Sequence, residues 1–137
     1  MNNDKKEHLK MVEDIITRMA SNSFKLKNWA ISLISAILIF ADYKQKICFI
    51  WIAFLPILAF WALDAFYLQL ERKYRTLYNY IQQDYINGTN NIPLFDMNTK
   101  DVDVDSVLRI MVSKSVWPIY AVILGAALIT LLIRCYK

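Results

Sequence analysis

Apolar residues are concentrated in three charge-free runs, at 28–41, 47–63 and 115–133. In a helix, residues 47–70 reach roughly 36 Å, which is enough to cross a hydrocarbon core of about 30 Å. The third run is long enough by itself. The first run reaches a spanning length if Lys27 and Lys44 extend to the two interfaces. The pattern therefore predicts three transmembrane helices.

Apolar positions recur at helical spacing on both sides of the first two runs. Steps of three and four from Leu9 to Met19 predict an amphipathic helix, which we expect to be interrupted at 21–23, because Ser and Asn side chains compete for local backbone groups. Heptad-like apolar steps from Tyr67 to Tyr85 predict that the second span continues out of the membrane as one helix from about Ile47 to about Tyr85. The turn-forming sequence 87–89 would end it.

The segment after this turn carries alternate acids at 101–105. We expect a short strand there, with Asp105 as the cap of a helix over 106–114. That helix would lead into the third span through Trp117 and a kink at Pro118.

Composition agrees with a helical membrane protein. Of the 137 residues, 57% are hydrophobic, and only 2 Gly and 3 Pro interrupt the pattern. We expect an all-α membrane protein with three transmembrane helices per protomer, an amphipathic N-terminal helix and a small cytoplasmic cap. The predicted division is a cytoplasmic helix over 1–23, two spans over 24–72, a helix extension and cap over 73–114, and the third span with an outer tail over 115–137. The apolar stripe from Tyr67 to Tyr85, on the extension of the second helix, needs a packing partner, which favours assembly as a homo-oligomer.

Basic residues predict the orientation. Two polar regions hold most of them: Lys5, Lys6, Lys10, Arg18, Lys25 and Lys27 precede the first span, and Arg72, Lys73, Arg75, Lys100, Arg109 and Lys114 follow the second. The remaining four are Lys44, Lys46, Arg134 and Lys137. The positive-inside rule places the N-terminus in the cytoplasm and the C-terminus outside, in the periplasm if the membrane is a bacterial inner membrane.

Asp64 is the ionisable residue of the second span, where a charge costs about 3 kcal/mol near mid-membrane. Two interpretations stay open: a role in an ion path, gating or interhelical contact, or an interfacial acid paired with a neighbouring basic group. Ser32 and Ser35, on the first span, could line a polar path or bond back to their own helix.

Catalytic and metal-binding patterns are absent from the sequence. The single histidine, His8, lies among charged residues and is expected to be a solvated surface residue. The acids at 101–105 lack the glycine and the terminal glutamate of a calcium loop. Cys48 and Cys135 are both expected at the outer face, as isolated thiols or as a disulfide. We therefore expect no enzyme, no metal and no cofactor.

Two stretches, 18–29 (RMASNSFKLKNW) and 60–72 (FWALDAFYLQLER), together with the loop 92–97, resemble a family of small bacterial three-span proteins linked to anti-phage defence. Within that class, the chain is similar to the membrane effectors of Hailong-type systems. In these systems a partner nucleotidyltransferase makes DNA oligomers that hold an oligomeric ion channel closed.

This resemblance implies a channel in the inner membrane, assembled from copies of the chain, with a tetramer as one candidate. It also implies a ligand-binding cap from about Tyr74 to Lys114 that recognises a single-stranded DNA oligomer or another nucleotide signal. The cap tyrosines could stack on bases while basic side chains meet phosphates. The residues implied are Arg72, Lys73, Arg75, Tyr78, Tyr80, Tyr85, Lys100 and Arg109. The alternative function is a non-conducting adaptor or scaffold that recruits a cytoplasmic partner.

Overall fold

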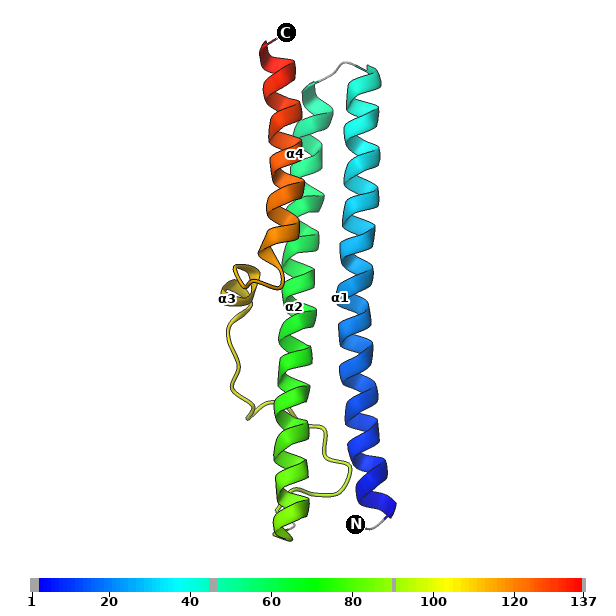
Figure 1. The fold of residues 1–137 in the computed structure, drawn as a ribbon, viewed down its shortest axis with the longest axis vertical. Coiled ribbons are helices and arrows are strands. Elements are labelled where there is room, and N and C mark those ends of the chain that lie inside the picture. Colours follow the sequence, from blue (N-terminus) through cyan, green and yellow to red (C-terminus); the bar gives the residue numbers. More distant parts are fainter. Residues whose placement is uncertain (1–2, 45–46, 90, 137) are drawn as a thin grey trace.

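The computed structural model describes residues 3–44, 47–89 and 91–136, and within these the secondary structure is helical, with no strand. Lys46 and Lys137 of the predicted outer face lie outside the described residues. Four helices follow in order: α1 (Asn3–Lys44), α2 (Ile47–Asn87), α3 (Val107–Met111) and α4 (Trp117–Tyr136) (Figure 1). Helices α1, α2 and α4 are each long and apolar enough to cross a membrane. The prediction of three transmembrane helices is confirmed to that extent, and the chain has the character of a multi-pass membrane protein.

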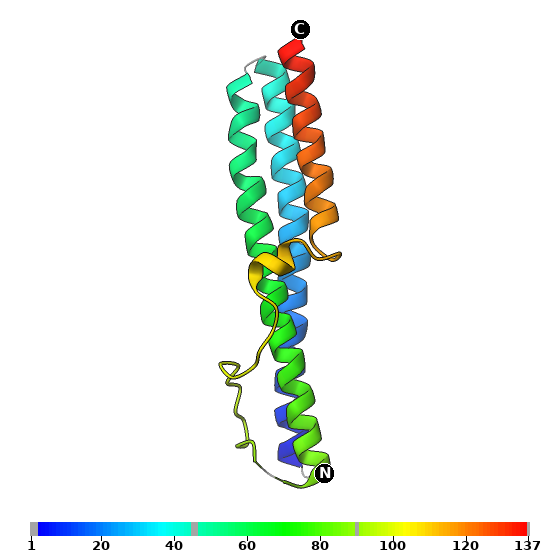
Figure 2. The same cartoon turned by 90° about the vertical axis from the view of Figure 1, so that its left-hand side faces the viewer.

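The long helices α1 and α2 form an antiparallel pair that runs the whole length of the molecule (Figures 1 and 2). Helix α4 packs beside the half of this pair that holds the C-terminal part of α1 and the N-terminal part of α2, and α3 lies beside the middle of α2. The described ends of the chain lie at opposite ends of the molecule, as an odd number of spans requires.

Helix α1 is continuous from Asn3 to Lys44, so the predicted interruption at 21–23 is wrong. The Ser23 hydroxyl donates its hydrogen bond to Asp64 on α2 and does not compete for its own backbone. The apolar section of α1 therefore continues without a break into its N-terminal polar section.

Helix α2 confirms the prediction that the second span continues as one helix to about Tyr85, with Pro56 inside it. It ends where the turn was expected: Gly88 has a φ of 69°, and the Thr89 amide donates to the Asp84 carbonyl at 3.3 Å. A residue without a Cβ adopts this left-handed conformation without strain.

The predicted strand before α3 is absent from the described residues. Ser106 caps α3, where its hydroxyl accepts a hydrogen bond from the Arg109 amide at 3.4 Å, so the assignment of Asp105 as the cap is wrong. The Asp105 carboxylate instead contacts the guanidinium groups of Arg72 and Arg109. Pro118 lies in the first turn of α4, where its missing N–H is not required, and not at a kink between two helices.

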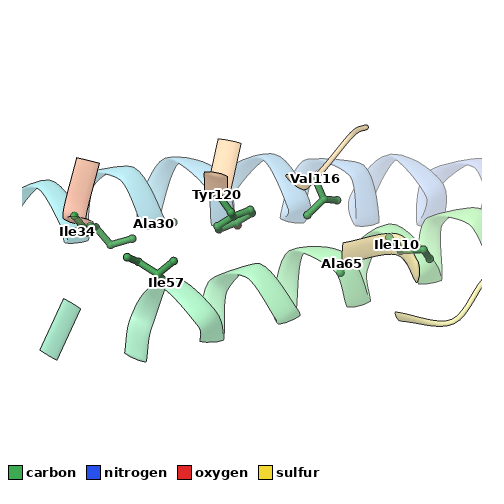
Figure 3. Packing of buried hydrophobic residues seen from close by; sticks show 8 residues of the cluster. Ala30, Ile34, Ile57, Ala65, Ile110, Val116 and Tyr120 are labelled. Carbon is green, nitrogen blue, oxygen red and sulfur yellow. The ribbon is translucent and has the colours of Figure 1, made fainter. Parts of the chain in front are cut away.

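Buried apolar residues form two clusters, one in each half of the molecule. Figure 3 shows the first, in which Ile34 of α1, Ile57 of α2 and Tyr120 of α4 meet in the membrane half. The second lies in the other half, between the N-terminal part of α1 and the C-terminal part of α2, and its buried members are Leu9, Val12, Leu77, Ile81 and Val102. The apolar stripe of the α2 extension is thus covered by α1 and by the loop of its own chain. It does not require a second copy, and the argument for self-association from this stripe fails.

Candidate functional site

Asp64 lies at the centre of a polar cluster between α1 and α2, and it is 0% exposed. The Lys27 ammonium lies 2.8 Å from Oδ1 and 2.7 Å from Oδ2 of this carboxylate. The Ser23 hydroxyl donates to Oδ1 and accepts a hydrogen bond from Lys27 at 2.9 Å. Among the described residues, Oδ2 of Asp64 has the ionic contact with Lys27 but accepts no hydrogen bond.

The antiparallel pairing of two continuous helices explains this cluster. Ser23 and Lys27 are one turn apart, so they present side chains on the same face of α1. Lys27 precedes the end of α1 by the same number of residues as Asp64 follows the start of α2, which brings both to the same level. Ser23 and Lys27 can be recognised in the sequence as partners of Asp64 once α1 and α2 are known to pair. Sequence reasoning missed Ser23 and Lys27 because it considered Asp64 on its own helix.

Aromatic residues join the start of α4 to the same level. The rings of Trp61 and Tyr120 stack with centroids 5.9 Å apart, and Trp61 Nε1 donates to the Met111 carbonyl at 2.9 Å. The Tyr120 hydroxyl lies near the Asp64 carboxylate and donates to the Phe60 carbonyl at 3.2 Å. The cluster therefore lies at the level of the first turn of α4.

The Lys27–Asp64 ion pair has a feature of each interpretation of Asp64, because it is a contact between two helices and it pairs the acid with a basic group. The partner comes from α1, and not from the basic residues that follow Asp64 on α2. About 26 Å of helix separate Asp64 from the start of α2, close to the thickness of a hydrocarbon core. Asp64 is enclosed between helices of its own chain, so its carboxylate lines no exposed surface.

Ser32 and Ser35 lie on another face of α1, where both are exposed together with Asn28. In the described part of the chain, neither serine hydroxyl bonds back to its own helix, whereas Thr130 donates to the Ala126 carbonyl at 2.8 Å. The polar side chains of Asn28, Ser32 and Ser35 are therefore exposed on the apolar section of α1.

Near the N-terminal end of α1, His8 is 0% exposed. Its Nδ1 lies 2.6 Å from the Tyr85 hydroxyl, and its Nε2 lies 2.9 Å from the Asp96 carbonyl. The expectation of a solvated histidine was wrong because His8 is one turn before Val12 and shares its buried face. Burial, together with the nearby charge of Asp84, raises the pKa of Tyr85 above its ordinary value.

Asp84 organises the turn that follows α2. Its carboxylate accepts hydrogen bonds from the Thr89 hydroxyl and from the amides of Asn91, at 3.0 Å, and Ile92, at 3.3 Å. The Thr89 hydrogen bond is the main cause that lowers the pKa of Asp84 below 3.8. The two amides and the charge of Lys5 assist, and burial opposes them.

The predicted ligand-binding residues are not gathered on one face of the cap. Arg72 and Arg109 both contact Asp105, at 3.4 and 2.9 Å, and Arg75 contacts Glu71 at 2.8 Å. Two of the tyrosines, Tyr78 and Tyr85, pack against the second buried cluster, whereas Tyr80 is 53% exposed. Lys73 lies on α2, half-buried, and Lys100 is exposed in the loop.

The far end of the membrane half is fastened by Arg134 of α4. Its guanidinium contacts the Asp42 carboxylate and donates to the Asp42 carbonyl at 2.9 Å. Cys48 and Cys135, near the same end, are exposed free thiols. Among the described residues, no group of three or more His, Cys, Asp or Glu side chains could hold a metal ion.

Comparison with known proteins gave no relative: no protein-family model, no curated protein and no solved structure matches this chain.

Proposed function

We propose that this chain is the protomer of a homo-oligomeric ion channel in a bacterial inner membrane and acts as an effector of anti-phage defence. One observation carries the channel proposal. Asn28, Ser32 and Ser35 are exposed on the protomer, although they belong to a helix apolar enough to cross a membrane. Hydrocarbon offers polar groups no partner, so these side chains are expected to face water or neighbouring protomers.

Gating from the cytoplasmic cap is supported by the continuity of α1 and α2. Both helices extend without interruption from the second buried cluster, which contains Val12 and Ile81, to the first, which contains Ile34 and Ile57. A ligand that displaces one helix at the cap therefore displaces its membrane section too. The Lys27–Asp64 ion pair ties the two helices together at the membrane edge, where this movement would be transmitted.

An oligonucleotide made by a partner nucleotidyltransferase is the ligand that the resemblance implies. The cap supports this part of the proposal through its exposed groups. The side chains of Arg75 and Arg109 are 62% and 76% exposed despite their ion pairs, and Tyr80 offers an accessible ring for base stacking. Binding would be expected to weaken as salt rises, because phosphate contacts release counterions.

Planar-bilayer recording of the purified protein tests the channel. We expect single-channel currents, and we expect Ser32→Leu combined with Ser35→Leu to reduce them strongly, whereas Leu55→Val on the exposed face of α2 leaves them unchanged. A wild-type protein that inserts without current, or that native mass spectrometry shows to be monomeric, would refute the proposal. Titration with labelled DNA oligomers tests the ligand, and a lack of salt-sensitive binding would remove it.

The adaptor function has one observation in its favour. Ile86, Leu94 and Phe95 are 75%, 46% and 44% exposed at the cytoplasmic end, where lipid does not cover them. An adaptor would bind a protein partner through these residues. A potential-sensitive dye separates the two functions in cells, because expression of an adaptor leaves the membrane potential intact.

A further inference from the structure

The exposed polar residues of α1 form a single stripe. Ser21, Lys25, Asn28, Ser32 and Ser35 follow one another at alternating steps of four and three residues, and each is exposed. This spacing keeps all five on one face of a helix, and it is the spacing with which helices pack around a common axis. We call this face the polar stripe.

The buried face of α1 has the same spacing and points in the opposite direction. Ser23, Lys27, Ala30 and Ile34 are buried or half-buried against α2 and α4. The two series are offset by two residues, or about 200° around a helix with 3.6 residues per turn. The polar stripe therefore points away from α2, and its last member, Ser35, borders a groove that Pro118 and Val122 of α4 also line.

The other exposed surfaces of the membrane half are suited to lipid. The most exposed large side chains there are apolar on α2, such as Leu55 at 76%, and on α4 beyond its groove with α1, such as Leu132 at 66%. In a membrane these surfaces would be solvated by acyl chains, whereas the polar stripe would not be. The apolar surfaces of α2 and α4 are therefore expected to face lipid, and the polar stripe of α1 to face the inside of an assembly.

We propose that the polar stripe lines a water-filled path, with α1 from several copies of this chain arranged around it. The inference rests on the proposed channel function and assigns the lining. From Lys25 to Ser35 the stripe covers roughly 15 Å of helix, about half of a hydrocarbon core. Ile39 continues the same spacing and is 71% exposed, so copies of Ile39 form an apolar ring beyond the polar section. Such rings close a path by excluding water.

The charges along α1 assign anions as the permeating class. Lys27 is neutralised by Asp64, and Asp42 by Arg134. Lys25, at the membrane edge of the stripe, has no ion-pair partner among the described residues. Copies of Lys25 form a positive ring at the cytoplasmic mouth, and rings of basic side chains favour anions such as chloride.

Charged thiol reagents test the lining in bilayers. In a Cys48→Ser, Cys135→Ser background, we expect Ser32→Cys or Ser35→Cys channels to lose current about fivefold after a negatively charged methanethiosulfonate is added. The matched control is Leu58→Cys on α2, which is 54% exposed and should stay insensitive. Conducting channels whose stripe cysteines do not respond, or that respond equally in the control, overturn the lining and leave the channel proposal intact. Absence of current in the unmodified background overturns both.

Ion selectivity tests the ring. We expect Lys25→Gln to lower the permeability of chloride relative to potassium by about fivefold, and Lys25→Arg to preserve it. Lys10→Gln, which removes an exposed cytoplasmic charge distant from the membrane, is the control and should change nothing. Conducting Lys25→Gln channels with unaltered selectivity would overturn the assignment of anions. Ile39→Ser should increase the open fraction, and a decrease would contradict the apolar ring.

Discussion

Removal of Lys27 tests whether the membrane-edge ion pair holds α1 and α2 together. In Lys27→Met, the Asp64 carboxylate stays in a position that is 0% exposed and keeps the Ser23 hydroxyl as its hydrogen-bond donor. Loss of one member of a buried pair leaves an uncompensated charge, which costs about 3–5 kcal/mol. We expect the free energy of unfolding to fall by that amount.

The double variant Lys27→Met, Asp64→Leu separates the ion pair from general packing. Replacement of both charges by apolar groups removes the uncompensated charge, so we expect the double variant to be at least about 2 kcal/mol more stable than Lys27→Met alone. The control is Lys25→Met, two residues away and exposed, which should shift stability by less than about 0.5 kcal/mol.

Equilibrium unfolding of the purified protein in mixed micelles, followed by tryptophan fluorescence, measures these differences. Trp61 is a suitable reporter because it stacks on Tyr120 beside the ion pair. A cost below about 1 kcal/mol for Lys27→Met, or simple additivity in the double variant, would refute the view that Asp64 needs Lys27.

Three further variants address the cytoplasmic end. His8→Phe keeps a ring but loses contacts to Tyr85 and Asp96, so it should cost about 1–3 kcal/mol and accelerate hydrogen exchange over 91–104, with exchange in α4 unchanged. The pKa of Asp84 is lowered in the folded protein, so its carboxylate stabilises the turn above pH 3.8, and this stabilisation is lost as the pH falls through the still lower folded pKa. Asp84→Asn should abolish this acid-dependent loss of hydrogen-exchange protection at the Thr89 amide. A pH dependence that persists in the variant would contradict the assignment. Gly88→Ala meets no neighbour within 4 Å but must adopt a φ of 69°, so it should cost about 1 kcal/mol in the same unfolding assay, and a neutral result would contradict the strain.

Local sequence patterns predicted the helices well where residues of the same segment determine the structure. The extent of α2 follows from the continuous apolar and heptad-like positions after Ile47, and its end follows from Gly88. The errors arose where a distant partner outweighed a local preference. Ser23 could have ended α1, but the Asp64 carboxylate takes its hydroxyl hydrogen bond. Asp105 could have capped α3, but two arginines bind its carboxylate.

The polar cluster around Asp64 was predictable in part, because one of its members is recognisable locally and the others depend on a distant helix. Asp64 was recognisable because a charge among apolar residues needs an explanation wherever it lies. Its partners come from α1, so their identity depends on how the two helices pair. The cap residues show the opposite case: Arg72, Arg75 and Arg109 were selected by charge alone, and each has an acidic neighbour that composition does not reveal.

The direct pairing of consecutive helices bears on how the protein is made. Because α1 and α2 adjoin in the chain, they can associate before the ribosome has completed α4. The hairpin would then leave the translocon with Lys27 and Asp64 already neutralising each other, and the insertion cost of about 3 kcal/mol for each lone charge would not arise separately. Helix α4 would dock last through Tyr120 and Ala127, its buried residues, and the guanidinium near its end would fasten the finished bundle to Asp42.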